Sequence, residues 1–266
     1  MPSGCVQTDD RVSFDFRNAA GQANPASTGA SLLFAASSRP SIDDVEALLS
    51  SGDAGAPVAR ISHRPAAEQG WLELLASGLT FDISGLRPAD PLPPLDLHHF
   101  YGFETNPRLE SLEAVELVPG GHIAGGGAMP PVVRTLAGLS AALALQMPVA
   151  AVAWHSAGTV MAPAYFARVV MNWLSGGAFP ALGLATLVPA EDGTISSQGL
   201  ATFCGQEFKL EAASGEHRPD VMKLALRVAD HIVRRGPLTV PGLIEDTGFF
   251  AEPLQAGKLV WVWRRG

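Results

Sequence analysis

Several kinds of residue and segment are scarce in this 266-residue chain. There are two cysteines, Cys5 and Cys204, and Cys5 lies in a polar stretch far from Cys204. Because disulfides persist mainly in oxidising compartments, we expect two free thiols in a reducing one. The opening residues, MPSGCVQTDD, contain no basic segment and no apolar run. The sequence therefore predicts no signal peptide, no lipid anchor at Cys5 and a cytoplasmic location.

Basic residues are also scarce. The chain has 18 Lys and Arg against 26 Asp and Glu, a formal net charge of -8. Its basic residues form no run longer than two, at Arg234-Arg235 and Arg264-Arg265. An acidic surface repels both nucleic-acid backbones and anionic lipids. We therefore expect no nucleic-acid partner and no membrane contact.

One uncharged stretch, residues 135–154, approaches the length of a membrane-spanning helix. Gln146 and Pro148 interrupt this stretch, and the apolar residues before them repeat at helical spacing. We interpret it as a buried helix followed by a buried strand.

The spacings that mark metal and cofactor sites are absent. The sequence has no H-E-x-x-H, C-x-x-C or H-x-H pattern. The stretch VPGGHIAGGGAMPPVV (118–133) joins a predicted strand to a predicted helix, and such a loop can hold an anion with backbone N–H groups. It lacks the lysine of a Walker motif and the spacing G-x-G-x-x-G. We expect no metal and no cofactor, and we interpret the loop as a surface connection, with anion binding as the alternative.

Hydrophobic periodicity predicts alternating strands and helices. The predicted strands are 30–37, 57–63, 71–85, 112–118, 149–155, 182–188, 200–211 and 258–266, and the predicted helices are 41–51, 131–147, 163–175 and 220–235. The later elements follow the order β-α-β-β-α-β of ferredoxin-like folds. The expected class is α+β, with two ferredoxin-like (βαββαβ) halves in which helices pack on one face of a mainly antiparallel sheet.

The composition along the chain predicts its division. Residues 1–29 are polar and rich in small residues, which is typical of a mobile tail. Residues 30–85 form the first half, and residues 86–110, with four prolines between positions 88 and 94, form a connection. Residues 111–266 form the second half, which packs on the first.

The pair His155-Ser156 ends a predicted buried strand. Neighbouring residues of a strand point to opposite faces, so this pair is poorly placed to act as base and nucleophile. The surrounding sequence, WHSAG, also differs from the hydrolase pattern G-x-S-x-G. We interpret the pair as a strand end. No catalytic residue is assigned, and the candidate ligand-binding residues are His122, Gly125, Gly126, Gly127, His155, Ser156, Gln206 and Glu207.

The last strand alternates Trp261 and Trp263 with valines. This places both tryptophans on one face of the strand. We expect that face to be in the core; an exposed stripe would instead form a docking surface.

Three segments of the second half resemble a bacterial family of unknown function. They are GGGAMPPVVRTLAGLSAAL, AVAWHSAGTVMAPAYFARVVMNWLSGGAFPALGL and SSQGLATFCGQEFKLE. The shared features are Trp154-His155, then Pro163 with Tyr165-Phe166, and lastly Gly199, Phe203, Gly205 and Glu207. The resemblance covers residues 110–240 and implies a cytoplasmic bacterial α+β protein. It carries no assigned reaction, so it assigns no catalytic residue here.

These observations predict a non-enzymatic protein that acts through protein contacts, with a protein partner or a homodimer. The alternative is a small-molecule sensor or enzyme whose cleft combines the 120–127 glycine loop, His155 and Glu207. The two hypotheses differ in geometry, because a cleft requires these residues to converge on one concave pocket.

Overall fold

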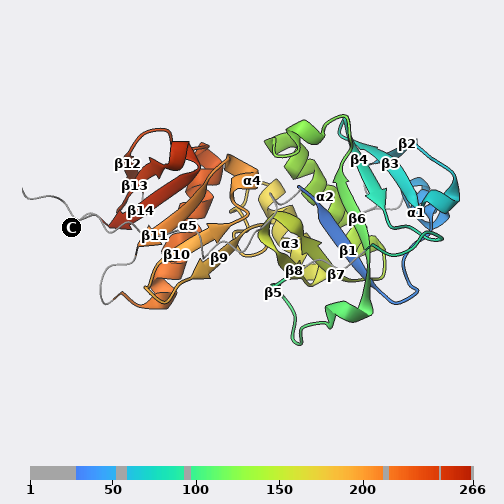
Figure 1. The fold of residues 1–266 in the computed structure, drawn as a ribbon, viewed down its shortest axis with the longest axis horizontal. Coiled ribbons are helices and arrows are strands. Elements are labelled where there is room, and N and C mark those ends of the chain that lie inside the picture. Colours follow the sequence, from blue (N-terminus) through green and yellow to red (C-terminus); the bar gives the residue numbers. More distant parts are fainter. Residues whose placement is uncertain (1–27, 52–58, 93–96, 212–215, 246, 265–266) are drawn as a thin grey trace, which may run out of the picture.

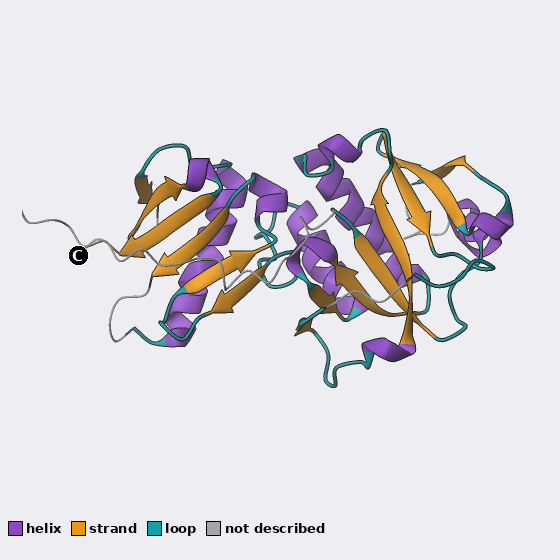
Figure 2. Ribbon diagram, viewed as in Figure 1, coloured by secondary structure: helices purple, strands orange, loops and turns teal. Residues whose placement is uncertain are grey.

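The computed structural model describes residues 28–51, 59–92, 97–211, 216–245 and 247–264 (Figures 1 and 2). Within these residues the chain forms two mostly antiparallel sheets and five α-helices, which confirms the α+β class. The helices are α1 (Ile42–Ser50), α2 (Pro130–Gln146), α3 (Pro163–Leu174), α4 (Ala201–Cys204) and α5 (Arg218–Arg235).

The first sheet has eight strands in the order β2-β3-β4-β6-β1-β7-β8-β5. Its strands are β1 (Ala30–Ala35), β2 (Arg60–His63), β3 (Trp71–Ala76), β4 (Leu79–Ser84), β5 (His99–Tyr101), β6 (Leu112–Pro119), β7 (Val149–Trp154) and β8 (Thr159–Met161). Only the pair of β5 and β8 is parallel among these described strands.

The second sheet has six strands in the order β12-β13-β14-β11-β10-β9. Its strands are β9 (Thr186–Pro189), β10 (Ile195–Gln198), β11 (Glu207–Glu211), β12 (Gly242–Ile244), β13 (Phe249–Leu254) and β14 (Leu259–Arg264). The strands β11 and β14 are parallel neighbours, and the other neighbouring pairs are antiparallel.

These sheets do not confirm two ferredoxin-like halves. A βαββαβ unit contains four strands, whereas the described sheets contain eight and six. The range 86–110, predicted as a connection, contributes β5 to the first sheet, and the chain passes to the second sheet after β8. The predicted tail lies almost entirely outside the described residues.

Local sequence signals explain where the elements begin. Ser41 caps α1 through a capping box with Asp44. Proline stands in the first turn of α2, α3 and α5. The stretch 71–85 folds as the hairpin β3–β4 around Ser77-Gly78, and residues 201–204, predicted as strand, form α4. The uncharged stretch 135–154 divides between α2 and β7, and no described helix is both long and apolar enough to cross a bilayer.

The helices lie on one face of each sheet. α2 contacts β1 and β6, and α3 contacts β7, so both cover the same face of the first sheet. The five buried residues of α5 (Val221, Ala225, Val228, Ala229 and Ile232) pack with the inward residues of the second sheet. Figure 1 shows the two sheets along the long axis of the molecule, with α2, α3 and α4 between them.

An aromatic cluster joins the two sheets. Phe203 of α4 lies 6.3 Å from Trp154 of β7, 5.7 Å from Trp173 of α3 and 4.8 Å from Phe179, measured between ring centroids. One continuous hydrophobic core therefore includes residues of both sheets.

Candidate functional site

His155 follows β7 and begins a short turn of 3-10 helix. Its backbone N–H donates to the carbonyl of Gly29, at 3.1 Å, just before β1. Ser31 of β1 lies between β6 and β7 and directly opposite Glu116. Because the alternate residues of β1 enter the core under α2, Ser31 and Glu116 point to the other, helix-free face. The sheet thus brings a serine, a histidine and a glutamate together on that face.

We name these three side chains the relay, because they lie in the order Ser31, His155, Glu116. Ser31 Oγ and His155 Nε2 are 2.8 Å apart and share a hydrogen bond. Glu116 Oε1 is 3.7 Å from His155 Nδ1, which exceeds a hydrogen-bond distance. Ser31 is 2% exposed, the side chain of His155 5% and that of Glu116 32%. Solvent therefore reaches the glutamate end of the relay and not the serine, the reverse of what a nucleophilic serine needs.

Burial also determines the charges of this cluster. It lowers the pKa of His155 from 6.5 to about 4, so the imidazole is neutral at pH 7. The same effect raises the pKa of Glu116 above its usual value. The histidine acts here as a neutral hydrogen-bonding group rather than as a cation.

The glycine-rich loop lies beside the strand that leads to this cluster. A side chain at Gly127 would lie 3.6 Å from Thr28, and one at Gly29 would lie 2.7 Å from the ring of His155. A Cβ at Gly126 would lie 3.2 Å from Met129 Sδ, whereas one at Gly125 would meet nothing within 4 Å. The loop and His155 therefore share one end of β1, on either side of residues 28 and 29.

His122 belongs to a neighbouring polar group. The nearby His122 acts to lower the pKa of the Asp82 carboxyl. The hydrogen bond that this carboxyl accepts from the backbone N–H of Gly121 acts in the same direction. Burial and the nearby charge of Glu73 raise the pKa of Asp82. By strand register, Asp82 lies on the same face as Glu116, at the diagonal position on the neighbouring strand.

Gln206 is committed to the second sheet. Its side-chain amide donates to the carbonyls of Leu238 and Gly257, at 2.8 and 2.7 Å. Its Oε1 accepts the N–H of Leu238 at 2.8 Å. These bonds hold the loops around β11 and leave Gln206 only 3% exposed.

Glu207 is also held by internal hydrogen bonds. Its carboxylate accepts from Ser197 Oγ at 2.5 Å and from the N–H of Ala201 at 3.0 Å. Burial nevertheless raises its pKa, although the hydrogen bonds act in the opposite direction. The carboxylate thus braces the start of α4.

Ser156 lies between the two groups. It is buried, and its Oγ forms no hydrogen bond with any described group. A side chain at Gly199 would meet the backbone of Ser156 and Ala157 at 2.8 Å, so the segment braced by Glu207 packs tightly there. The structure brings His155 and the glycine loop to one region but gives Gln206 and Glu207 internal bonding roles.

Among the described residues, no three His, Cys, Asp or Glu side chains gather in a way that could hold a metal ion. Cys204 is a buried free thiol, as predicted, and burial raises its pKa to about 11. It is therefore protonated and unreactive at neutral pH. Cys5 lies outside the described residues.

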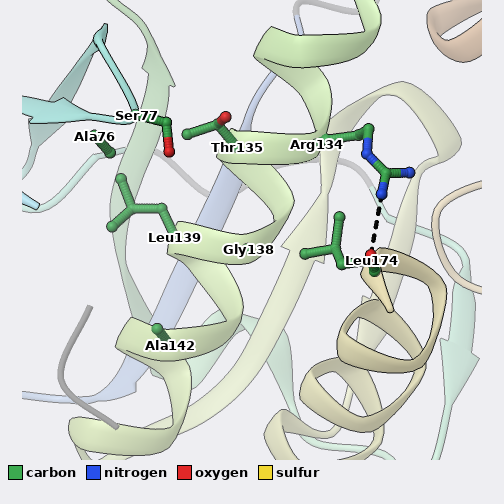
Figure 3. Close-up of a pocket in the computed structure, with 8 residues that line it drawn as sticks. All are labelled: Ala76, Ser77, Arg134, Thr135, Gly138, Leu139, Ala142 and Leu174. Carbon is green, nitrogen blue, oxygen red and sulfur yellow. Dashed lines mark hydrogen bonds between the residues drawn. The ribbon is translucent and has the colours of Figure 1, made fainter. Parts of the chain in front are cut away.

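A pocket of about 330 Å³ lies away from all of these residues (Figure 3). The groove crosses α2 at Gly138, with Ser77 of the β3–β4 turn on one side and Leu174 on the other. Arg134 donates to the carbonyl of Leu174 at 3.2 Å and stacks over Trp173. This arginine caps the end of α3, so its visible role is structural.

The outer face of the second sheet carries the two tryptophans of β14. Val260 and Val262 are fully buried, whereas Trp261 and Trp263 are half-buried and point away from α5. The prediction that these tryptophans lie in the core is therefore wrong. The alternation was visible in the sequence, but it did not show which of the two faces α5 covers. We name Leu243, Phe250, Trp261 and Trp263 the aromatic face.

No protein-family model matches this chain, and comparison with curated proteins and with solved structures found no match. The resemblance to a bacterial family of unknown function stays a prediction.

Proposed function

We propose that this protein acts through protein–protein contacts rather than by catalysis, and that it forms a homodimer through the aromatic face. The supporting observation is the apolar surface on the outer side of the second sheet. Leu243 is 64% exposed, and the rings of Phe250 and Trp263 lie 5.1 Å apart beside it. Figure 2 shows α5 behind this sheet, with the strands toward the viewer. Apolar side chains that gather on one outer face, with an exposed leucine beside half-buried aromatic rings, are typical of interaction surfaces.

Strand register arranges the surface in rows. Leu243, Phe250 and Trp263 are cross-strand neighbours on β12, β13 and β14. In the next row, Glu252 and Lys209 flank Trp261 on its two sides. The acid and the base thus lie on opposite sides of the central strand.

This arrangement favours a second copy of the chain as the occupant. A two-fold axis parallel to β14 would place Lys209 of each copy over Glu252 of the other, with the tryptophans between them. Such an interface is closed and self-complementary. Lys209 contacts the ring of Trp261 and Asp192, while Glu252 is exposed and forms no ion pair with any described residue. Glu252 is therefore available to the other copy.

Sedimentation velocity at increasing protein concentration tests this proposal. We expect the wild-type chain to sediment as a dimer, and Leu243→Lys and Trp263→Lys to sediment as monomers. Leu145→Lys on α2 and Met171→Lys on α3 are matched controls, because both residues are apolar and exposed outside the aromatic face. A wild-type monomer at every concentration, or dimers in all four variants, would contradict the proposal.

A charge swap tests the orientation of the two copies. Lys209→Glu and Glu252→Lys should each weaken the dimer, because each change opposes like charges across the axis. The double variant should restore it. If the double variant is weaker than either single variant, the proposed axis is wrong.

A second candidate function, acyl transfer at Ser31, is favoured by the order of the relay. Ser31 Oγ would attack an acyl carbonyl while its proton passes to His155 Nε2 and then to the leaving group. Glu116 would orient the imidazole only once its carboxylate closes the 3.7 Å distance to His155 Nδ1. The burial of Ser31 places this candidate below the first.

A fluorophosphonate probe and intact-protein mass spectrometry test the second candidate. Acyl-transfer chemistry predicts one adduct at Ser31, which is lost in Ser31→Ala and forms about 100-fold more slowly in His155→Gln. Ser156→Ala is the control, because Ser156 neighbours His155 but lies outside the relay. An unlabelled wild-type protein would eliminate this candidate.

A further inference from the structure

A second pocket, of about 540 Å³, lies along α5. Arg227, His231, Arg234 and Arg235 line it, and Phe179 and Leu226 supply apolar surface. Its volume suits a small molecule. Its residues take no part in the aromatic face or the relay.

The charge of α5 differs from that of the rest of the chain. The helix carries five Lys and Arg against two Asp, whereas the whole chain has a net charge of -8. Lys223, Arg227 and His231 follow one another at intervals of four, so they share one side of the helix. The sequence has no long basic run, and only the helical spacing gathers these side chains.

Two of the four basic groups in the pocket are already neutralised. Arg234 pairs with Asp230 at 3.0 Å, and Arg235 pairs with Glu245 at 2.5 Å. Asp230 also accepts the backbone N–H of Phe179 at 2.7 Å, which fixes its carboxylate. These pairs hold two guanidinium groups at the edge of the pocket.

The other two basic groups are unpaired. Within the described residues, the side chains of Arg227 and His231 form no hydrogen bond and no ion pair. Arg227 therefore adds an uncompensated positive charge to a pocket whose two acids, Asp230 and Glu245, each pair with another of its arginines. A guanidinium group binds phosphate with two parallel hydrogen bonds, and an anion would satisfy the free donors.

We propose that this pocket binds a small organic phosphate. The phosphate group lies against Arg227 and His231, with Arg234 at the edge, and the organic part rests on Phe179 and Leu226. Phe179 is 5% exposed and Leu226 is half-buried, so they form a firm apolar floor. The alternative is a solvated basic helix face without a specific site, which would attract every anion equally and weakly.

Isothermal titration calorimetry with phenyl phosphate and with inorganic phosphate, at fixed ionic strength, tests the proposal. We expect phenyl phosphate to bind more tightly than inorganic phosphate, because only the former covers the apolar floor. Arg227→Gln should weaken phenyl phosphate binding by about tenfold or more. Arg218→Gln is the matched control, because Arg218 is an exposed arginine of α5 that does not line the pocket.

Each other outcome overturns the proposal. Equal affinity for phenyl phosphate and inorganic phosphate would show that the pocket does not recognise the organic part of the ligand. Equal losses of affinity in Arg227→Gln and Arg218→Gln would indicate unspecific attraction to the basic helix. Absence of binding would exclude the site. Because the Arg227 side chain is exposed and unpaired, the thermal unfolding of Arg227→Gln should match that of the wild type. His231→Gln is a second variant that should also weaken the binding of phenyl phosphate.

Discussion

At the residue scale, burial on the helix-free face of the first sheet determines how His155 behaves. The ring has one hydrogen bond, to Ser31, and too little solvent to stabilise a positive charge. A histidine whose pKa is lower in the folded state binds a proton more readily after unfolding. Its contribution to stability is therefore fully present above pH 6.5 and is lost as the pH falls toward about 4.

We predict that His155 makes the free energy of unfolding depend on pH. Between pH 6.5 and 4 the wild-type protein should lose about 3 kcal/mol through this residue. Urea unfolding at several pH values should show a shallower dependence in His155→Gln. Glu116 titrates in the opposite sense because its pKa is raised, so the comparison is repeated in the Glu116→Gln background. Equal pH dependence with and without His155 would refute the prediction.

The ring of His155 occupies the space where a side chain at position 29 would lie. A Cβ there would lie 2.7 Å from His155 Nδ1 and 3.0 Å from Val118. We expect Gly29→Ala to destabilise the protein by about 1–3 kcal/mol in urea unfolding, because the ring or the strand must move. Gly125→Ala is the control, since a Cβ there meets nothing within 4 Å. A similar effect of both variants would show that the ring is free to shift.

The relay could not be predicted from the sequence, and its separation along the chain is the reason. Ser31 and His155 are 124 positions apart, and only the register of β6, β1 and β7 makes them neighbours. The sequence singles out His155, but its only local neighbour of matching chemistry is Ser156, which strand geometry excludes as a partner. By contrast, the basic side of α5 could have been predicted from the sequence, because Lys223, Arg227 and His231 are spaced four residues apart.

At the element scale, alternation predicted most strands but did not determine their buried side. Both faces of β14 are apolar, so side-chain size suggested that the tryptophans were inside. The inward face instead takes Val260 and Val262, whose small side chains allow α5 to pack closely. The strand predicted over residues 200–211 is partly wrong for a different reason. Gly205, with φ of 77°, ends the helical turn α4 before the strand begins.

A pair of substitutions should separate the two faces of the second sheet. Val262→Thr places a hydroxyl in a fully buried site and should cost about 2 kcal/mol. Leu243→Thr, on the aromatic face, should change the stability by less than about 0.5 kcal/mol. Both are measured by urea unfolding at a concentration where the chain is monomeric. A larger loss for Leu243→Thr would mean that the aromatic face is covered in the monomer.

At the scale of the whole molecule, composition did not show that one continuous core includes residues of both sheets. The proline-rich range was interpreted as the division, whereas β5 within it belongs to the first sheet. The two sheets meet instead through Phe203, which contacts aromatic rings on β7 and α3. No local pattern marks such a junction, because its members look like ordinary core residues in their own elements.

This junction predicts how the protein unfolds. Because one core includes both sheets, calorimetry should show a single transition for the wild type. Phe203→Ala removes the ring that contacts Trp154, Trp173 and Phe179, so it should cost about 3–5 kcal/mol and separate the unfolding of the two sheets. Phe81→Ala, in the first sheet alone, should cost a similar amount but keep one transition. Two transitions in the wild type would show that the sheets are energetically independent and that the aromatic cluster joins them only in space.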